Sequence, residues 1–299
     1  MSQLLIIGST CVDVIINMDS LPKTGDDLEP EGQTFTVGGC GWNVFRATRL
    51  TGADPVFLSP VGTGVFGDMV ARTFADWDVP VLARCEEENG CCYCLVENGG
   101  ERTFLSVHGG EYLIRREWLD ALEGEYSLAY VCGMELQEPT GPEILDWLED
   151  HREVEIFYAP GTRGVMMDKP RQDRILALGP IVHLNATEAA ALTGEADPIR
   201  AAQALGSRTG NTVIITLGGD GCLCRTKEGD ILQIPSKPVT VADTIGAGDT
   251  HAGVLLGCIH QGMDMKQALT LANAAAAETV SRPGADIPET LGGMTYGTV

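Results

Sequence analysis

Apolar residues follow two different spacings along the chain. Short continuous apolar runs indicate buried strands, and apolar residues three or four positions apart indicate helices. The expected strands are Leu4–Ile7, Val56–Val61, Leu128–Cys132, Val154–Tyr158, Ile181–Leu184 and Val213–Leu217. The expected helices are one that opens at Gly38–Gly39 and runs through Leu50, then Asp68–Trp77, Pro142–Glu149, Glu188–Thr193, Gly246–His260 and Met265–Val280. This alternation predicts an α/β fold with a mostly parallel central sheet and helices on both faces.

Two stretches lack intervening helices. Val14–Val37 and Gly90–His108 contain residues that alternate between apolar and polar, as strands do. Within the second stretch, Glu97-Asn98-Gly99-Gly100 has the composition of a hairpin turn. We therefore expect a small β-strand lid, built from residues 14–37 and 90–108, on a single domain that covers residues 1–299.

Composition narrows the class of protein. The 299 residues include 42 Asp plus Glu against 20 Lys plus Arg, a formal net charge of −22. Such a chain is unsuited to coating nucleic acid or an anionic membrane surface. No apolar run approaches the roughly 20 residues of a transmembrane helix. Met1–Gly8 lacks the basic residues that begin a signal peptide, so we expect a cytoplasmic protein.

The chain has 10 cysteines, which we expect to be free thiols in a reducing compartment. The dense group is Cys85, Cys91, Cys92 and Cys94. A zinc site there is one interpretation, but two separated C-x-x-C pairs are lacking. The alternating positions of Cys92 and Cys94 favour small apolar residues in a strand.

The strongest glycine motif is Asp243-Thr244-Ile245-Gly246-Ala247-Gly248-Asp249, which opens an expected helix. Bare N–H groups and the partial positive charge of a helix N-terminus attract anions. Asp249 would repel a bound phosphate unless it takes a proton from an attacking hydroxyl. The alternative is that Asp249 only caps the helix.

A second motif, Gly62-Thr63-Gly64-Val65-Phe66-Gly67, matches the dinucleotide pattern G-x-G-x-x-G. It follows a later strand than the first, and the acidic run Glu86–Glu88 is expected to have no strand ending there. A dehydrogenase is therefore the remote alternative. The P-loop pattern G-x-x-x-x-G-K-[ST] is absent from the sequence.

Further motifs occur in a fixed order. They are Gly8-x-x-x-x-Asp13, Gly38-Gly39-Cys40-Gly41-Trp42-Asn43, Val61-Gly62-x-x-x-Phe66-Gly67, Gly99-Gly100-Glu101-Arg102-Thr103, Asn185-Ala186-Thr187-Glu188, Thr216-Leu217-Gly218 and the Asp243–Asp249 motif. In this series, from Ile6 to about Ile287, the chain resembles the ribokinase-like (PfkB) family of carbohydrate and nucleoside kinases. The last motif is the most specific of them.

The resemblance implies roles position by position. Asp249 matches the family's catalytic base, and Gly246, Ala247 and Gly248 match its anion hole. Positions that bind the acceptor hydroxyls are matched by Asp13, Gly39 and Asn43. The ATP-binding positions are matched by Asn185, Glu188, Thr216, Gly218, Gly221 and Asn273. Glu188 would reach Mg²⁺ through water, and Asp243, with the carbonyl of Ile245, matches a site for a monovalent cation such as K⁺ in some members.

Some positions depart from the family pattern or leave a choice. Cys40 stands where ribokinases commonly have Lys, which makes ribose itself doubtful as the acceptor. Trp42 could stack on a sugar face or a nucleobase, or could only pack beneath the lid. His251 is expected to be structural, and His108 and His183 receive no role. An acceptor-site acid is expected within Met134–Glu138, where Glu135 and Glu138 both qualify.

The leading hypothesis is an ATP-dependent kinase, with Mg²⁺, that phosphorylates a hydroxymethyl group of a sugar or sugar-like substrate. The first alternative is a nucleoside kinase, including a pseudouridine-type kinase, and a remote one is a non-catalytic sugar-binding regulator. Expected partners are therefore small molecules, together with a second copy of the chain paired through the lid.

Overall fold

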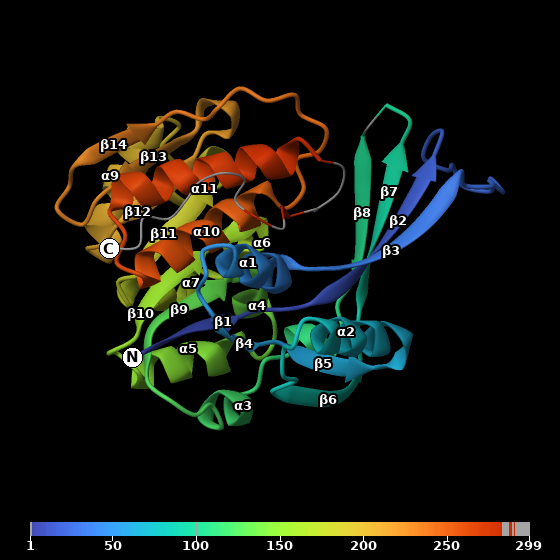
Figure 1. The fold of residues 1–299 in the computed structure, drawn as a ribbon, viewed down its shortest axis with the longest axis horizontal. Coiled ribbons are helices and arrows are strands. Elements are labelled where there is room, and N and C mark those ends of the chain that lie inside the picture. Colours follow the sequence, from blue (N-terminus) through green and yellow to red (C-terminus); the bar gives the residue numbers. More distant parts are fainter. Residues whose placement is uncertain (1, 100, 283–286, 289, 291–299) are drawn as a thin grey trace.

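A mixed sheet runs through the centre of the molecule (Figure 1). The computed structural model describes residues 2–99, 101–282, 287, 288 and 290. The strand order is β14-β13-β12-β11-β10-β9-β1-β4, parallel from β12 to β4 and antiparallel at β12–β13 and β13–β14. Its strands are β1 (Gln3–Ile7), β4 (Val56–Leu58), β9 (Tyr126–Cys132), β10 (Glu155–Ala159), β11 (Ile181–Asn185), β12 (Val213–Thr216), β13 (Cys222–Arg225) and β14 (Ile231–Ile234).

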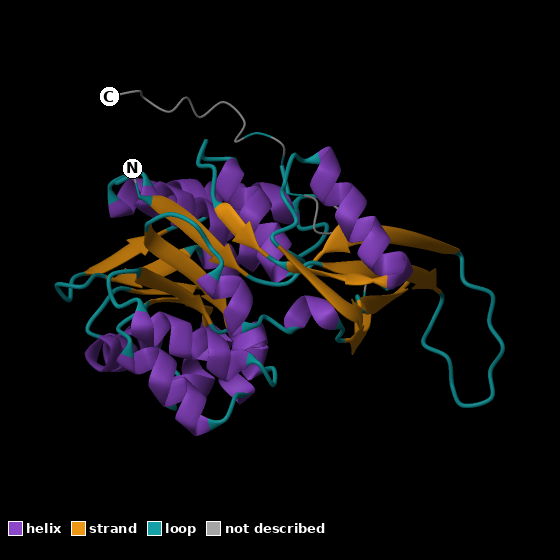
Figure 2. Cartoon of the chain, turned by 90° about the horizontal axis from the view of Figure 1, so that it is seen from below, coloured by secondary structure: helices purple, strands orange, loops and turns teal. Residues whose placement is uncertain are grey.

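Successive residues of these strands face opposite helical layers (Figure 2). In β1, Leu4 and Ile6 belong to one buried cluster and Leu5 and Ile7 to the other. The first cluster packs against α1 (Cys40–Arg49), α10 (Ala247–His260) and α11 (Met265–Val280). The second packs against α3 (Arg116–Asp120), α5 (Gly141–Asp150), α7 (Lys169–Ala177), α8 (Ala186–Thr193) and α9 (Pro198–Thr209). Burial on both faces explains the continuous apolar runs and confirms the predicted α/β fold.

A separate sheet, which we call the lid sheet, stands at one end of the molecule (Figure 1). Its order is β3-β2-β7-β8, formed by β2 (Cys11–Met18), β3 (Gly32–Gly38), β7 (Cys91–Glu97) and β8 (Arg102–Val107). The hairpin expected in residues 90–108 is the antiparallel pair β7–β8. In the stretch 14–37, strands occupy only the two ends, and the residues between β2 and β3 form the long loop at the right of Figure 2.

The lid sheet joins the body at a buried carboxylate. Glu111, in the short helix η1 (Gly110–Tyr112), is fully buried and accepts hydrogen bonds from the N–H groups of Gly90 (2.7 Å) and Gly109 (3.2 Å). A Cβ on Gly90 would lie 1.9 Å from the carbonyl oxygen of Val107. The two strand ends can therefore cross only because Gly90 has no side chain.

The strand expected at Val56–Val61 is divided in the structure. Its first half is β4 of the main sheet, whereas β5 (Pro60–Thr63) pairs with β6 (Ala83–Glu88) in a separate sheet. Ser59 is buried between them, with its hydroxyl 2.9 Å from that of Thr10. The break follows from Pro60, because proline has no N–H group with which to continue the main ladder.

The G-x-G-x-x-G motif has a packing role at this point. It connects β5 to α2 (Gly64–Asp76), and a Cβ on Gly67 would lie 2.2 Å from the carbonyl oxygen of Gly62. The expectation that no strand ends at Glu86–Glu88 was wrong, because β6 ends there. However, β5 and β6 form a two-stranded sheet apart from the main sheet. The motif therefore does not follow a strand of the main sheet, as the dinucleotide-binding motif of a doubly wound fold does.

Two further features bear on the class of protein. No helix in the described ranges is both long and apolar enough to cross a membrane. All the cysteines are free thiols, and within the described residues His, Cys, Asp and Glu side chains form no group of three or more that could hold a metal ion.

The packing of α1 against α10 depends on Gly253. A Cβ at this position would lie 2.5 Å from the carbonyl oxygen of Val44 and 2.6 Å from Cβ of Ala47. We predict that Gly253→Ala lowers the free energy of unfolding by about 1–3 kcal/mol, measured by urea denaturation, because backbone must move. Gly206→Ala in α9 is the control, since the three atoms nearest to its Cβ would all belong to the side chain of Arg225 and not to backbone. Equal effects of both substitutions would contradict this account.

Candidate active site

The loop before α10 is held in a defined conformation. The N–H groups of Ala242 and Asp243 donate to the carbonyl oxygen of Val280, at 2.8 and 3.1 Å. Asp243 Oδ1 accepts from the N–H of Ile245 at 2.9 Å. Gly246 caps the helix with a φ of 73°, a conformation that favours glycine. The N–H groups of the first turn of a helix have no partner within the helix, so Gly248 and Asp249 present theirs at its end.

Asp249 lies in this first turn and is tied to α1. Asn43 Nδ2 donates to Asp249 Oδ2 at 2.9 Å. Asn43 is buried, and its Oδ1 has no hydrogen-bond partner among the described residues. The start of α1 is fixed by Gly39, whose φ is 100° and whose Cβ would lie 2.9 Å from the carbonyl oxygen of Ser9. The geometry leaves a buried acceptor, Asn43 Oδ1, available to a hydroxyl donor beside Asp249.

The surroundings of Asp249 raise the pKa of its carboxyl group, which makes it a stronger base than an exposed Asp. Burial raises its pKa to about 6, and the nearby carboxylates of Glu135 and Asp13 act in the same direction. The hydrogen bond from Asn43 opposes this and favours the charged form. Burial also raises the pKa of Asp13 to about 6. A carboxylate with such a pKa accepts a proton more readily than an ordinary Asp while remaining mostly ionised at neutral pH.

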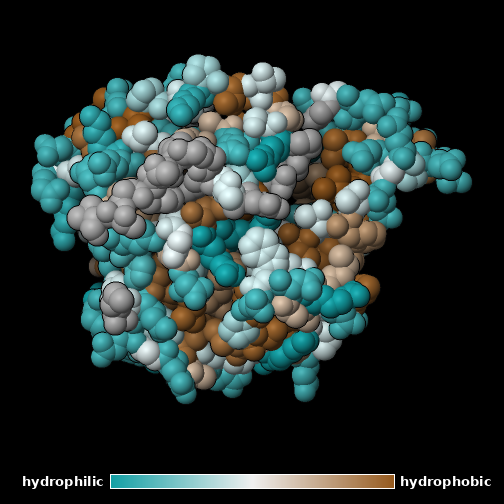
Figure 3. All heavy atoms as spheres, in the orientation of Figure 1, coloured by the Kyte–Doolittle hydropathy of each residue, from teal (hydrophilic) through white to brown (hydrophobic). Residues whose placement is uncertain are grey.

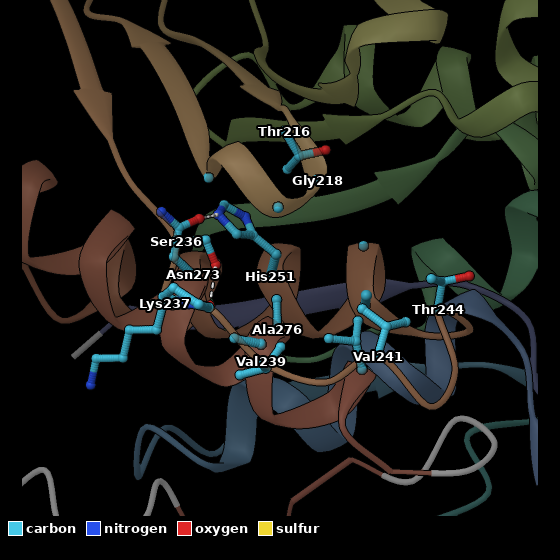
Figure 4. A pocket seen from close by; sticks show the side chains of 17 residues that line it. Thr216, Gly218, Ser236, Lys237, Val239, Val241, Thr244, His251, Asn273 and Ala276 are labelled. Carbon is cyan, nitrogen blue, oxygen red and sulfur yellow. Dashed lines mark hydrogen bonds between the residues drawn. The ribbon is translucent and has the colours of Figure 1, made fainter.

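One cavity, of about 330 Å³, lies between the end of β12 and the start of α10, and we call it the β12–α10 pocket. Thr216 and Gly218 lie on one side of it, with Val239, Val241 and Ala276 opposite (Figure 4). The predicted ATP-binding residues in its lining are Thr216, Gly218, Gly221 and Asn273, and the predicted anion-hole residues are Ala247 and Gly248. The predicted nucleotide-loop and anion-hole residues thus meet in one pocket, with an apolar slot beside them.

A buried hydrogen-bond chain supports the wall of this pocket. Asn273 Nδ2 donates to the carbonyl oxygen of Ile234 at 2.9 Å, so its Oδ1 accepts from His251 Nε2 at 3.1 Å. His251 Nδ1 is then left to accept from His183 Nε2 at 2.8 Å. Burial lowers the pKa of His251 to about 4, so both rings are neutral. His251 therefore orients Asn273, and the sequence spacing of 68 residues hid its partner His183.

A second cavity, of about 730 Å³, lies under the lid sheet, and we call it the lid pocket. Polar groups from several elements converge there, including Asp13 and Asn17 of β2, Thr34 and Thr36 of β3, Arg102 of β8, and Asp243. Ile245 also lines it, whereas Thr244, Ala247 and Gly248 line the β12–α10 pocket. The loop that leads to Asp249 therefore runs along both cavities.

Asp243 has a protein cation beside it. The Arg102 guanidinium binds both oxygens of the Asp243 carboxylate, with Nη2 donating to Oδ2 at 2.7 Å and Nη1 donating to Oδ1. A K⁺ ion would need those oxygens and would be repelled by the guanidinium. The residues present therefore do not fit the monovalent-cation site that was expected at Asp243.

Asn185 and Glu188 form a capping box at the start of α8. Asn185 Oδ1 accepts from the N–H of Glu188 at 2.9 Å, and Glu188 Oε2 accepts from the N–H of Asn185 at 3.0 Å. Asn185 also pairs in register with Thr216 of the β12–α10 pocket. An oriented carboxylate beside a pocket fits Mg²⁺, which commonly keeps its waters and uses few protein ligands.

Trp42 lies outside both pockets. Its side chain is 1% exposed and stacks on Phe45 and Phe74, with ring centroids 5.5 and 5.3 Å apart. The hypothesis that Trp42 stacks on a sugar or a nucleobase was therefore wrong. An apolar cluster at the α1–α2 interface explains the residue. Phe45 lies in the same helix as Trp42, but Phe74 comes from α2, and the sequence around Trp42 does not show that contact.

The two candidate acids have different surroundings. Glu135 is fully buried at the start of α4 (Gly133–Gln137), where its Oε1 accepts from the N–H of Ser9 at 2.8 Å. Glu138 lies 2.6 Å from Nδ1 of His108, whose ring stacks on Tyr112. The sequence gave His108 no partner, because the pair forms only when the end of β8 meets the segment after α4.

Comparisons with known proteins agree with this architecture. Residues 1–291 match the pfkB family of carbohydrate kinases. The chain is 32% identical over 296 residues to an uncharacterised sugar kinase of Escherichia coli (strain K12), YegV, covering 96% of this chain and 91% of that protein. The ribokinase of Thermotoga maritima superposes with a TM-score of 0.82 at 20% identity, covering 95% of each chain. The ribokinase of Arabidopsis thaliana, solved with ribose and ATP, superposes at 0.79 with 21% identity, covering 97% of this chain and 96% of that one. The chain belongs to the pfkB family of carbohydrate kinases.

Proposed function

We propose that this chain transfers the γ-phosphoryl group of ATP to a hydroxymethyl group of a sugar or sugar acid bound in the lid pocket. The observation that carries the proposal is the position of Asp249. Its carboxylate is held by Asn43 in the first turn of α10, at the end of a loop that lines both cavities. A base and a group of free N–H donors at one helix end match the needs of an in-line transfer.

The acceptor is held by the polar groups of the lid pocket. Asp13 and Thr36 lie opposite each other in β2 and β3, and both line the cavity. Carboxylate, amide and hydroxyl groups bind adjacent sugar hydroxyls with directional hydrogen bonds. Asn43 Oδ1, a buried acceptor without a partner among the described residues, would accept a hydrogen bond from a hydroxyl group of the bound substrate. Gly39 contributes by holding the start of α1 close to Ser9.

ATP occupies the β12–α10 pocket in this proposal. The apolar slot of Val239, Val241 and Ala276 suits a flat base, and Figure 4 shows the Lys237 side chain directed away from it. The N–H groups at the start of α10 would hold the charge that develops on the transferred phosphoryl group. The solved complex of the Arabidopsis ribokinase with ribose and ATP supports this pairing of ligands. Mg²⁺, held through water by Glu188 near Asn185, would neutralise phosphate charge.

A nucleoside acceptor is the second candidate. The lid pocket also has apolar residues, and Phe104 among them is 52% exposed. An exposed aromatic ring can stack on a nucleobase. Phe104 therefore replaces Trp42 as the residue that distinguishes the two acceptor classes.

ATP consumption across sugars, sugar acids and nucleosides tests the proposal. We predict turnover with at least one acceptor, and a loss in kcat of at least about 10²-fold in Asp249→Asn, because the base is removed. The KM for ATP should stay within about threefold of wild type. Asp76→Asn, an exposed residue at the end of α2, is the matched control. Near-normal turnover in Asp249→Asn would exclude Asp249 as the base.

The pH profile tests the same residue independently. Asp249 must be ionised to accept a proton, so kcat/KM should fall as pH falls through about 6. Asn43→Ala removes a hydrogen bond that lowers the pKa of Asp249, so the acid limb should move to higher pH. A profile that stays flat between about pH 5 and pH 7 in wild type would contradict this assignment.

We also propose that two copies pair through the lid sheet. Side chains alternate across a strand, so Phe35, Leu105 and Val107 face away from the pocket lined by Thr36 and Phe104. These three are 48%, 57% and 55% exposed. In Figure 3 the outer end of the lid is mainly hydrophilic, and apolar surface lies on its inner side, near the rest of the molecule. Sedimentation velocity should give a dimer that Leu105→Lys dissociates and Leu28→Lys, in the loop after β2, does not. A monomeric wild type would refute the pairing.

A further inference from the structure

One ion pair connects the lid sheet to the loop that carries the helix N-terminus. Arg102 belongs to β8, and the Asp243 side chain that it binds is only 1% exposed. The contact uses both carboxylate oxygens and two guanidinium nitrogens. This fork geometry is specific to arginine, because the ammonium of lysine is a point charge.

The carboxylate of Asp243 shapes the backbone that follows it. Its Oδ1 also accepts from the N–H of Ile245, and Ile245 directly precedes the helix cap Gly246. Burying an ionised carboxylate is costly unless a positive partner stabilises it. Loss of the Arg102 guanidinium would therefore destabilise the Asp243 carboxylate in this position and weaken its hold on the Ile245 N–H. The charge of Arg102 therefore stabilises the conformation of the loop that leads to Gly248 and Asp249.

The guanidinium supplies here the charge that a bound ion would otherwise supply. It belongs to the chain itself, so the pair does not depend on a dissolved cation. Because Arg102 is part of the lid sheet, the ion pair ties that sheet to the loop before α10.

We propose that Arg102 is a positioning residue for phosphoryl transfer, a tethered cation that orders the Asp243–Gly248 loop and makes turnover independent of K⁺. The proposal deepens the proposed function and rests on it. Arg102 does not contact the transferred group in this account. It acts through Asp243 on the backbone donors and on Asp249.

Steady-state kinetics in K⁺, Na⁺ and tetramethylammonium buffers test the proposal. Wild-type kcat should vary by less than about twofold among the three. Arg102→Ala should lose about 10²-fold in kcat, since a small misplacement of catalytic groups has effects of that size. Added guanidinium or K⁺ should restore part of this loss, and Arg102→Lys should retain more activity than Arg102→Ala. Arg84→Ala, an exposed arginine of β6, should match wild type.

Strong activation of the wild type by K⁺ would overturn the proposal, as would an unchanged kcat in Arg102→Ala. Loss of activity that neither guanidinium nor K⁺ restores would also overturn it, because a merely structural role gives that result.

Hydrogen exchange provides a readout that does not need turnover. Backbone amides in residues 243–250 should exchange at least about tenfold faster in Arg102→Ala than in wild type and in Arg84→Ala. Added guanidinium should slow this exchange again. Unchanged exchange would contradict the positioning role even if no acceptor is phosphorylated. Absence of turnover in wild type, with the exchange effect present, would count against the proposed function and not against the Arg102–Asp243 coupling.

Discussion

The hydrogen bond from Asn43 to Asp249 is the interaction on which the account of the site depends. It joins two helices on the same face of the sheet at 2.9 Å, and it holds the carboxylate at the end of a loop that lines both cavities. The helices can come this close because Gly253 lets α10 approach the backbone of α1. Gly41 plays a similar part, since its Cβ would lie 2.5 Å from the carbonyl carbon of Gly8 at the end of β1. Gly41 and Gly253 therefore act through close backbone approach, whereas a Cβ on Gly218 or Gly248 would meet open space.

The charged and polar groups around Asp249 matter more for its pKa than the net charge of the chain, −22. Asp13, Glu135 and Asp249 lie near one another, and their burial and mutual repulsion raise the pKa of Asp249. The opposing contributions are local, namely the side-chain hydrogen bonds from Asn43 and Cys40, which lower the pKa of Asp249. Local donors outweigh surface charge at this range, because salt screens exposed charges beyond about 8 Å.

The sequence was most informative where the signal is local. Continuous apolar runs predicted β1, β9, β11 and β12, and the glycine motif predicted the start of α10 to within one residue. Prediction from the sequence failed where a contact joins segments that are far apart along the chain. His108 and Glu138 are 30 residues apart, and His183 and His251 are 68 apart, so no spacing rule could pair them. The placement of Trp42 in an apolar cluster, and of Arg102 on Asp243, depends likewise on tertiary packing.

In the proposed function, the phosphoryl group passes in one direct step between two cavities that share one loop. The most direct measurement uses ATP made chiral at the γ-phosphorus, with the configuration of the phosphorylated product determined after turnover. Direct in-line attack by the acceptor hydroxyl that Asp249 deprotonates predicts inversion at phosphorus. Retention of configuration would require two successive displacements through a phosphorylated enzyme and would contradict the account.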